Sequence, residues 1–222
     1  MTDRVKHKRR YESPHRRAQA AETRRQILEA ARGLFEERGY TATTMAAIAA
    51  EAGVALKTVY LAFETKSGVL RALWQLFLRG DEGEAPVGER AWYREVLDEP
   101  DPRRQLQLNA RNSRAVKERA GTVLGVIRSG ASVDADIAEL WGRIVQTEFY
   151  DNQRTIVESL QKKKALRAGL DVTRATDILW TLNHPDVWLL LVGERSWTPE
   201  QYEQWLAEAS CAQLLGDPVR RA

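Results

Sequence analysis

The chain has 222 residues and 43% of them are hydrophobic, which is enough for a sizeable buried core and excludes a disordered protein. No apolar run approaches the roughly 18 residues that span a bilayer, and no apolar region follows the basic N-terminus as in a signal peptide. We therefore expect no membrane segment and a cytoplasmic location, with which the single cysteine, Cys211, agrees.

The formal net charge of +3 is unevenly distributed along the chain. Residues 1–68 hold 13 Lys and Arg against 8 Asp and Glu, whereas residues 69–222 hold 21 against 23. Such an asymmetry indicates a polyanionic partner for the N-terminal part, although an ordinary solvated surface gives the same pattern.

Residues 1–20 are rich in Lys and Arg, contain Pro14 and lack apolar periodicity. They are predicted to be a disordered basic arm. We favour weak, nonspecific contact of this arm with DNA, as basic N-terminal arms make in other DNA-binding domains. A solubilising tail is the alternative.

Residues 22–37 carry apolar side chains at helical spacing, which predicts an amphipathic helix closed by Gly39. Residues 43–63 follow as two shorter helices around Gly53, since Met45, Ile48 and Ala49 repeat at helical spacing before it and Val59 and Phe63 do so after it. A glycine adopts positive φ at little cost, and a tight connection between crossed helices is typical of a helix-turn-helix. The second helix would expose side chains suited to a duplex groove: Leu56, Lys57, Thr58 and Tyr60.

Three further residues are candidate phosphate contacts or caps. Thr43 and Thr44 precede the Met45 helix as possible N-caps, and the start of a helix also suits a phosphate. Lys66 begins the next helix, where the helix dipole disfavours a cation. An external phosphate is therefore a better explanation of Lys66 than local stability.

The order of these elements resembles the N-terminal domain of the TetR family of transcriptional regulators over roughly residues 25–73. Three runs carry the resemblance: Ile27-Leu28-x-Ala30-Ala31-x-x-Leu34-Phe35-x-x-x-Gly39-Tyr40, Thr43-Thr44-Met45-x-x-Ile48-Ala49-x-x-Ala52-Gly53-Val54 and Thr58-Val59-Tyr60-x-x-Phe63-x-x-Lys66-x-x-x-Leu70. So many positions at fixed spacing are more specific than one short motif.

The resemblance implies phosphate contacts from Thr44, Tyr60 and Lys66, and base or groove contacts from Leu56, Lys57 and Thr58. Two positions depart from the family. Ala55 stands where a capping Ser is common, and Ala62 stands where His or Tyr often meets the DNA backbone. One cap and one contact are therefore expected to be missing.

The remainder of the chain shows helical patterns and no strand pattern. Helices are predicted from Asp101 to about Ser129, from Asp134 to about Lys164, over residues 173–182, and from Thr198 to Gly216. The fold class is therefore all-α. The expected domains are the arm at 1–20, the helix-turn-helix domain at 21–68, and a helical effector-binding and dimerisation domain at 69–222 that begins with a connecting helix.

The last helices are candidates for a homodimer interface. Residues 187–192 are almost continuously apolar, and the final helix presents Tyr202, Trp205, Leu206 and Ala209 on one face. Two such helices look like half of a four-helix bundle, which is the dimer interface in the TetR family. An intramolecular core is the alternative, and we favour the dimer because a two-fold operator requires one. Cys211 is expected to be a small core or interface residue.

Polar residues inside apolar stripes are the candidate effector site. Glu148 and Asn152 lie at helical spacing beside Trp141 and Phe149, with Asn109 and Asn112 on the preceding helix. Trp180 and His184 form a second candidate lining. The alternatives are that Glu148 and Asn152 lie on a wet edge or pair with an arginine, and that His184 finishes a helix.

Together these patterns predict a homodimeric transcriptional repressor that binds a palindromic operator in double-stranded DNA and is released by an unknown small-molecule effector. Control by a protein partner, or no effector, is the alternative. The chain has no glycine-rich phosphate loop, no nucleophile with its base and no metal-ligand spacing, so we predict neither an enzyme nor a cofactor or metal.

Overall fold

The computed structural model describes residues 14–79 and 90–216. The predicted arm falls partly at residues 1–13, which lie outside this range. Its remaining part was predicted wrongly as disordered, because residues 14–20 belong to the first helix, α1 (Pro14–Ala42). The helix predicted for residues 22–37 therefore starts about two turns earlier.

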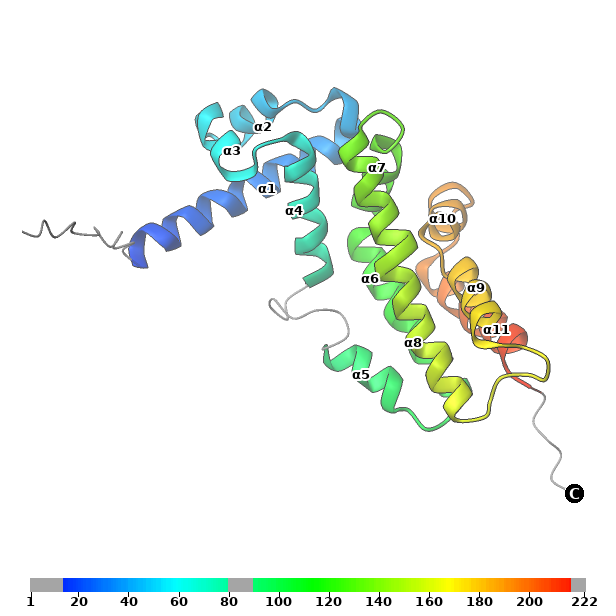
Figure 1. Ribbon diagram of the computed structural model, residues 1–222. Helices are drawn as coiled ribbons and strands as arrows, with labels where there is room; N and C mark the ends of the chain where they lie inside the picture. Colours follow the sequence, from blue (N-terminus) through cyan, green and yellow to red (C-terminus); the bar gives the residue numbers. More distant parts are fainter. Residues whose placement is uncertain (1–13, 80–89, 217–222) are drawn as a thin grey trace, which may run out of the picture.

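Four helices build the N-terminal part: α1, α2 (Met45–Glu51), α3 (Leu56–Phe63) and α4 (Lys66–Arg79) (Figure 1). The regular part of α1 ends at Gly39, which takes a left-handed φ of 71° as the sequence predicts. Thr44 caps α2 through its side chain, and Gly53, with φ of 65°, allows the turn to α3. The axes of α2 and α3 differ by 113°, which is the crossing typical of a helix-turn-helix.

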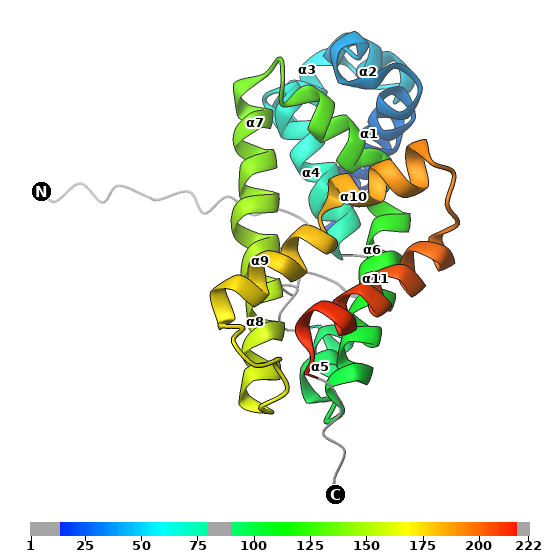
Figure 2. The same ribbon diagram turned by 90° about the vertical axis from the view of Figure 1, so that its right-hand side faces the viewer.

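The described residues of the C-terminal part form helices joined by short turns and loops, together with one isolated bridge between Leu166 and Leu215. Its segments are α5 (Ala91–Asp98), α6 (Pro102–Gly130), α7 (Ala135–Gly142), the π-helix η2 (Arg143–Glu148), α8 (Phe149–Lys162), α9 (Val172–Leu182), α10 (Pro185–Trp188), the π-helix η3 (Leu189–Glu194) and α11 (Pro199–Leu214). Figure 2 shows α9, α10 and α11 covering one side of the long helices α6 and α8. The predicted all-α fold, with its helix-turn-helix, connecting helix α4 and helical C-terminal domain, is confirmed.

Several helix starts follow from local sequence. Asp101 caps α6 ahead of Pro102, and Asp134 caps α7, as predicted. Thr198 and Gln201 form a reciprocal capping box at the start of α11, also as predicted. The continuous helix predicted from Asp134 to Lys164 is instead interrupted by η2, where the backbone widens into π-helical turns.

The buried apolar side chains form three clusters. The largest joins α1 to α4 with the C-terminal half of α6, α7 and η2, so the core of the helix-turn-helix continues into the second part. A second cluster joins α5, α6, α8, α9 and α11 and includes Cys211, which is a buried core residue as expected. A small third cluster surrounds Trp188, Tyr202 and Leu206.

Two hydrogen bonds connect the N-terminal part to the start of α7. The Tyr40 hydroxyl donates to the carboxylate of Asp134, and the Ser67 hydroxyl donates to Asp136 over 3.0 Å. The bond from Tyr40 lowers the pKa of Asp134. Beside this junction the tyrosine ring packs against Gly130, where an added Cβ would approach Tyr40 Cγ to 3.0 Å.

No single helix among the described residues is long and apolar enough to cross a membrane. The bent pair α2 and α3 reaches that length and composition only when the two are taken together. Their apolar side chains, including Ile48 and Val59, are already buried in the largest cluster.

Candidate DNA-binding surface and C-terminal site

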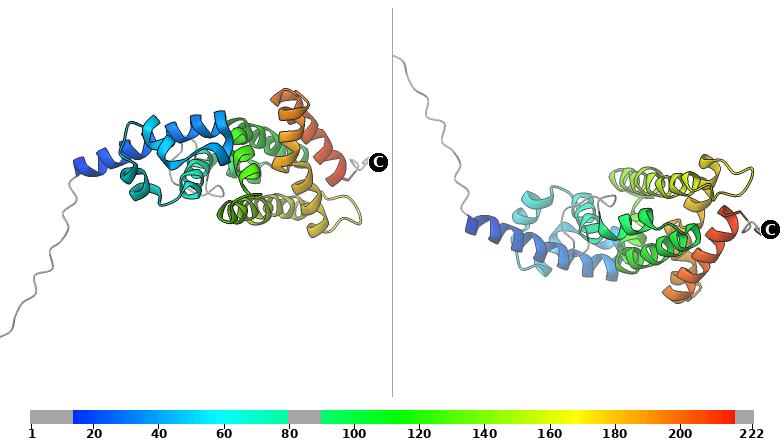
Figure 3. Two further views of the ribbon diagram at one scale, coloured as in Figure 1. Left: turned by 90° about the horizontal axis from the view of Figure 1, so that it is seen from above. Right: turned by 90° about the horizontal axis from the view of Figure 1, so that it is seen from below.

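The outer face of α3 is the most exposed apolar and cationic surface of the helix-turn-helix. Leu56 is 41% exposed and Tyr60 48% exposed, and Lys57 is exposed between them. Thr58 is half-buried. The helix-turn-helix lies at one end of the molecule and α9 to α11 at the other (Figure 3). This face is therefore available to a duplex without interference from the C-terminal helices.

Leu61 is a member of this face that sequence reasoning missed. Its side chain is 77% exposed, the highest value among the exposed large apolar residues. It lies one turn after Lys57, so the i, i+4 spacing could have identified it.

The ends of α3 are held by contacts other than a side-chain N-cap. Ala55 makes no side-chain cap, as expected from its departure from the family pattern. At the other end, Arg24 of α1 donates from Nη1 to the carbonyl of Ala62 over 2.7 Å, and its guanidinium lies 4.1 Å from the centre of the Phe63 ring. The helix α1 therefore supports the end of α3.

Of the two predicted threonines, only Thr44 is accessible. Thr44 is exposed and accepts a hydrogen bond from Ala47 N over 3.1 Å, which makes it the N-cap. Thr43 is fully buried, with Oγ1 2.8 Å from Gly39 O and 3.1 Å from Leu34 O. The prediction that Thr43 contacts DNA is wrong, because its hydroxyl is needed to satisfy carbonyls at the end of α1.

Lys66 has a local role that the sequence did not indicate. Its Nζ donates to Tyr40 O over 2.7 Å and lies 4.1 Å from the centre of the Tyr40 ring. Partial burial lowers its pKa. The argument that an external phosphate explains Lys66 better than local stability therefore does not hold, because these contacts give the lysine a local role. Its contact with DNA stays a prediction.

Three of the predicted effector-site residues meet in the C-terminal part. The His184 ring lies 4.8 Å from the Trp180 ring and 6.2 Å from the Trp141 ring, measured between centroids. Trp180 donates from Nε1 to Val145 O over 2.8 Å and so satisfies a carbonyl of η2. His184 Nδ1 accepts from Asp186 N over 3.1 Å, so the residue caps the start of α10 and does not finish α9, whose C-cap is Asn183. Burial lowers the pKa of His184.

The four predicted polar residues are more dispersed. Asn112 donates to Trp92 O over 3.0 Å, and the backbone carbonyl of Asn152 accepts from Tyr93 over 3.0 Å, so both help to hold α5. Asn109 is buried on α6. Glu148 is exposed at the end of η2, and partial desolvation of its carboxyl raises its pKa. These positions do not form one cluster.

The most unusual polar group, Lys117 on α6, was not predicted. It is 3% exposed, and burial lowers its pKa well below the usual value. Its Nζ donates to Asn183 O over 2.6 Å, to Asn183 Oδ1 over 2.5 Å and to Tyr202 Oη over 2.6 Å, with Ser113 Oγ at 3.1 Å. The lysine therefore joins α6 to the end of α9 and to α11.

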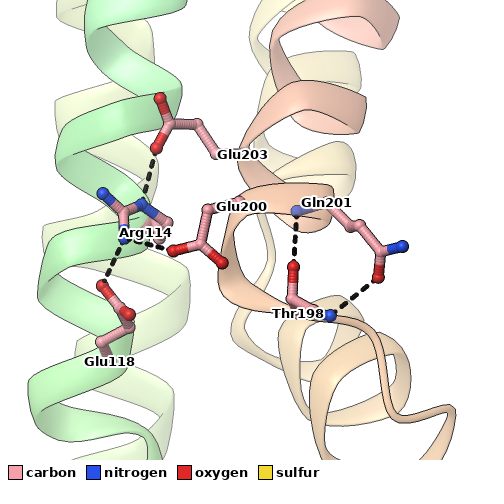
Figure 4. Close-up of polar contacts among 6 residues, drawn as sticks. All are labelled: Arg114, Glu118, Thr198, Glu200, Gln201 and Glu203. Atoms are coloured by element: carbon pink, nitrogen blue, oxygen red, sulfur yellow. Dashed lines mark hydrogen bonds and ion pairs between the residues drawn. The ribbon is translucent and has the colours of Figure 1, made fainter.

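An ion-pair cluster one turn earlier on α6 holds the start of α11 from outside (Figure 4). Arg114 donates to Glu203 over 2.6 Å, to Glu118 over 3.0 Å and to Glu200 over 3.2 Å. The capping box of Thr198 and Gln201 lies in the same turn. Together with Lys117, these contacts fix the position of α11 on α6.

This packing corrects one part of the predicted dimer face. Tyr202 and Leu206 are fully buried within the chain, so these two residues belong to an intramolecular core and not to a dimer interface. Leu190 of η3 remains 45% exposed. Trp205 is partly buried, and its ring packs edge-to-face against Trp197 at 6.3 Å between centroids.

Residues 27–73 match the family model of bacterial regulatory proteins of the tetR family. The chain is 26% identical over 166 residues to the HTH-type transcriptional regulator AcrR of Shigella flexneri, covering 72% of this chain and 74% of AcrR. Its fold is similar to two solved structures. The SmeT–triclosan complex has a TM-score of 0.69 and 20% identity and covers 89% of this chain and 94% of SmeT, the repressor of a Stenotrophomonas maltophilia multidrug efflux pump. NalD, the secondary repressor of an efflux pump in Pseudomonas aeruginosa, has a TM-score of 0.66 and 23% identity, covering 89% and 99%.

The matched residues span α1 to α4, from the helix that supports α3 through the helix-turn-helix to the connecting helix. The similarity to AcrR and to the solved structures extends over most of the remaining helices. AcrR is a transcriptional regulator, and SmeT and NalD are repressors. Residues 27–73 thus carry the DNA-binding domain of the tetR family, and the chain as a whole is similar to transcriptional regulators that contain this domain.

Proposed function

We propose that the protein is a homodimeric repressor that reads a palindromic operator and leaves it when a small molecule binds the C-terminal part. The observation that carries this proposal is the outer face of α3, where Lys57 and Tyr60 stand exposed on a helix whose other face is buried. A helix of this geometry fits the major groove. Thr44, Thr58 and Lys66 are the further proposed contacts, and the proposed boundary between the two functions lies at residues 68 and 69.

The repressor role is supported by the roles of proteins with a similar fold. SmeT and NalD are both repressors of efflux pumps, and SmeT is known in complex with triclosan. The shared fold makes an effector of comparable size a reasonable expectation for this chain. The aromatic group around His184, formed with Trp141 and Trp180, is one proposed wall of its site.

The dimer is proposed to form through η3 and the outer side of α11. Leu190 is exposed there, and Trp197 and Trp205 are only partly buried. Sedimentation at micromolar concentration tests this arrangement. A dimer is expected for the wild-type chain and a monomer for Leu190→Glu, whereas a monomeric wild type would contradict the proposal.

Selection of binding sites from random DNA tests the operator function. Wild-type protein is expected to enrich two inverted half-sites about one or more helical turns apart. Lys57→Ala should lower operator affinity by roughly 1–3 kcal/mol and relax the base preference. Tyr60→Phe should weaken operator and random DNA about equally. Equal losses on both DNAs for Lys57→Ala would argue against base reading.

The selected operator then provides an assay for release. Compounds that raise the melting temperature of the protein are tested for displacement of the operator fragment. Displacement by at least one of them supports an effector. If none both binds and displaces the DNA, control by a protein partner, or no effector, becomes the better description.

A further inference from the structure

A stripe of buried or partly buried polar side chains runs along α6 in the C-terminal part. Its members are spaced four residues apart, so they lie on one face of the helix: Gln105, Asn109, Ser113 and Lys117. Gln105 donates to Ser159 of α8 over 3.0 Å, and Ser113 hydrogen-bonds Asn183 after α9. The stripe therefore faces α8 and the end of α9, inside the domain.

Lys117 differs from the rest of the stripe because its protonated form carries a charge that no carboxylate of the described residues balances. Its acceptors are all neutral: the two oxygens of Asn183, and the hydroxyls of Tyr202 and Ser113. No carboxylate of the described residues forms an ion pair with it, and burial is the sole cause of its lowered pKa. A buried cation without a counter-ion is unfavourable, so the site lacks one negative charge.

The surroundings of the ammonium group are aromatic. Nζ lies 4.9 Å from the centre of the Tyr202 ring and 5.8 Å from that of Phe149. His184 follows Asn183 directly and packs edge-to-face against Trp180 at 4.8 Å. A ligand whose anionic group reached Lys117 would thus have aromatic and apolar contacts for its body.

Two features would allow the site to open without breaking a regular helix. Asn183 lies in the break between α9 and α10, outside both helices. For its side chain to withdraw, only side-chain hydrogen bonds would have to be exchanged, namely those with Nζ, Ser113, Gln153 and Tyr202. Phe149 follows the π-helix η2 directly, and π-helical turns occur frequently at functional sites.

We propose that Lys117 is the recognition residue for an organic acid, a carboxylate on an aromatic or aliphatic body, which takes the place of the Asn183 side chain. This inference rests on the proposed effector function and names the class of effector. The carboxylate supplies the missing negative charge, and the aromatic side chains pack against the body. Because Asn183 and Tyr202 then lose their shared partner, acid binding also changes how α9 and α11 are held on α6.

The test compares acids with neutral amides of the same shape on the full chain. The probes are three pairs: benzoate with benzamide, 1-naphthoate with 1-naphthamide, and decanoate with decanamide. Binding of each is measured from the melting temperature of the protein and from its tryptophan fluorescence. At least one acid is expected to bind with a Kd at least tenfold below that of its amide. Lys117→Met should remove this preference. Lys163→Met is the matched control, since Lys163 also donates to a backbone carbonyl and an amide oxygen, from Glu99 and Gln105, and should keep it.

A second variant keeps the proposal testable if Lys117→Met does not fold. Asn183→Asp places a carboxylate beside Nζ in nearly the same shape, so it should raise the melting temperature and abolish the acid response. Equal binding of acids and amides to the wild type, an acid preference that survives in both variants, or no acid binding at all would overturn the inference.

The operator assay separates the two proposals. Acids that bind through Lys117 but leave the operator complex intact would contradict the effector function and preserve the acid site. Neutral compounds that displace the operator, with no acid doing so, would preserve the effector function and contradict the acid site.

Discussion

The DNA-binding part and the C-terminal part bury different kinds of side chain. Around α1 to α3 the interior is apolar, with Thr43 as its buried polar residue, and the polar groups stand outside. In the C-terminal part, charged and amide side chains lie inside, among them Lys117, Gln153 and Asn183. The difference indicates where each part can make specific polar contacts. The DNA-binding part can make them on its surface, and the C-terminal part in its interior.

The largest expected effect comes from opening the apolar interior of the DNA-binding part. Phe35 is almost fully buried and stacks on Tyr40. Phe35→Ala should lower the free energy of unfolding by about 3–5 kcal/mol, because a large cavity remains. Urea denaturation measures it. For Leu61→Ala, on the exposed face of α3, the free energy of unfolding should stay within about 0.5 kcal/mol of that of wild type. A loss as large as that of Phe35→Ala would mean that Leu61 is packed against other residues.

The buried lysine should give the C-terminal part a pH dependence. Its folded pKa lies below the unfolded value of 10.5, so between the two the unfolded chain binds the proton and stability rises with pH. As the pH rises towards 10.5, the free energy of unfolding of wild type relative to Lys117→Met should therefore rise, by no more than about 1.4 kcal/mol per pH unit. A constant difference in urea titrations would show that the ammonium is well accommodated.

A smaller effect is expected at the junction between the two parts. Tyr40→Phe keeps the ring but removes the hydrogen bond to Asp134. Tyr40→Phe should lower the free energy of unfolding by about 1–2 kcal/mol at pH 7. The folded pKa of Asp134 is lowered, so this contribution is present above the unfolded value of 3.8 and is lost as pH falls through the folded pKa. Thermal unfolding at pH 7 and pH 3 measures it, and an equal cost at both would contradict the assignment.

The smallest effect is a gain at the start of α3. Ala55 has extended backbone angles and no side-chain cap. Ala55→Ser should stabilise the chain by about 0.5–1 kcal/mol by capping an exposed amide. Chemical denaturation compares Ala55→Ser with Ala55→Gly, which should stabilise the chain less. No gain from the serine would mean that water already satisfies these amides.

Much of the fold follows from interactions between residues near in sequence. The caps at Thr44, Asp134 and Thr198 satisfy amides two or three residues away, so the pattern of side chains identifies them. The exposed face of α3 follows similarly from helical periodicity. The π-helices could not be predicted, because sequences 143–148 and 189–194 fit an α-helix equally well.

The functional residues that the sequence predicted wrongly or missed have partners that are distant along the chain or that depend on a turn. Lys66 meets Tyr40, 26 residues earlier, and this contact gives it a local role. Lys117 meets Asn183 and Tyr202 at separations of 66 and 85 residues. Read alone, a lysine within an otherwise polar stretch of α6 suggests a solvated surface, and only the packing of α9 and α11 reveals its burial.

The contact between Gly130 and Tyr40 limits the direction in which movement can be transmitted. A methyl group at position 130 would lie 3.0 Å from Tyr40 Cγ and 3.2 Å from Ile137 Cγ2, so the end of α6 already stands at its closest approach. Packed interiors resist compression. The end of α6 could therefore move closer to α1 only if the Tyr40 ring or Ile137 moved with it.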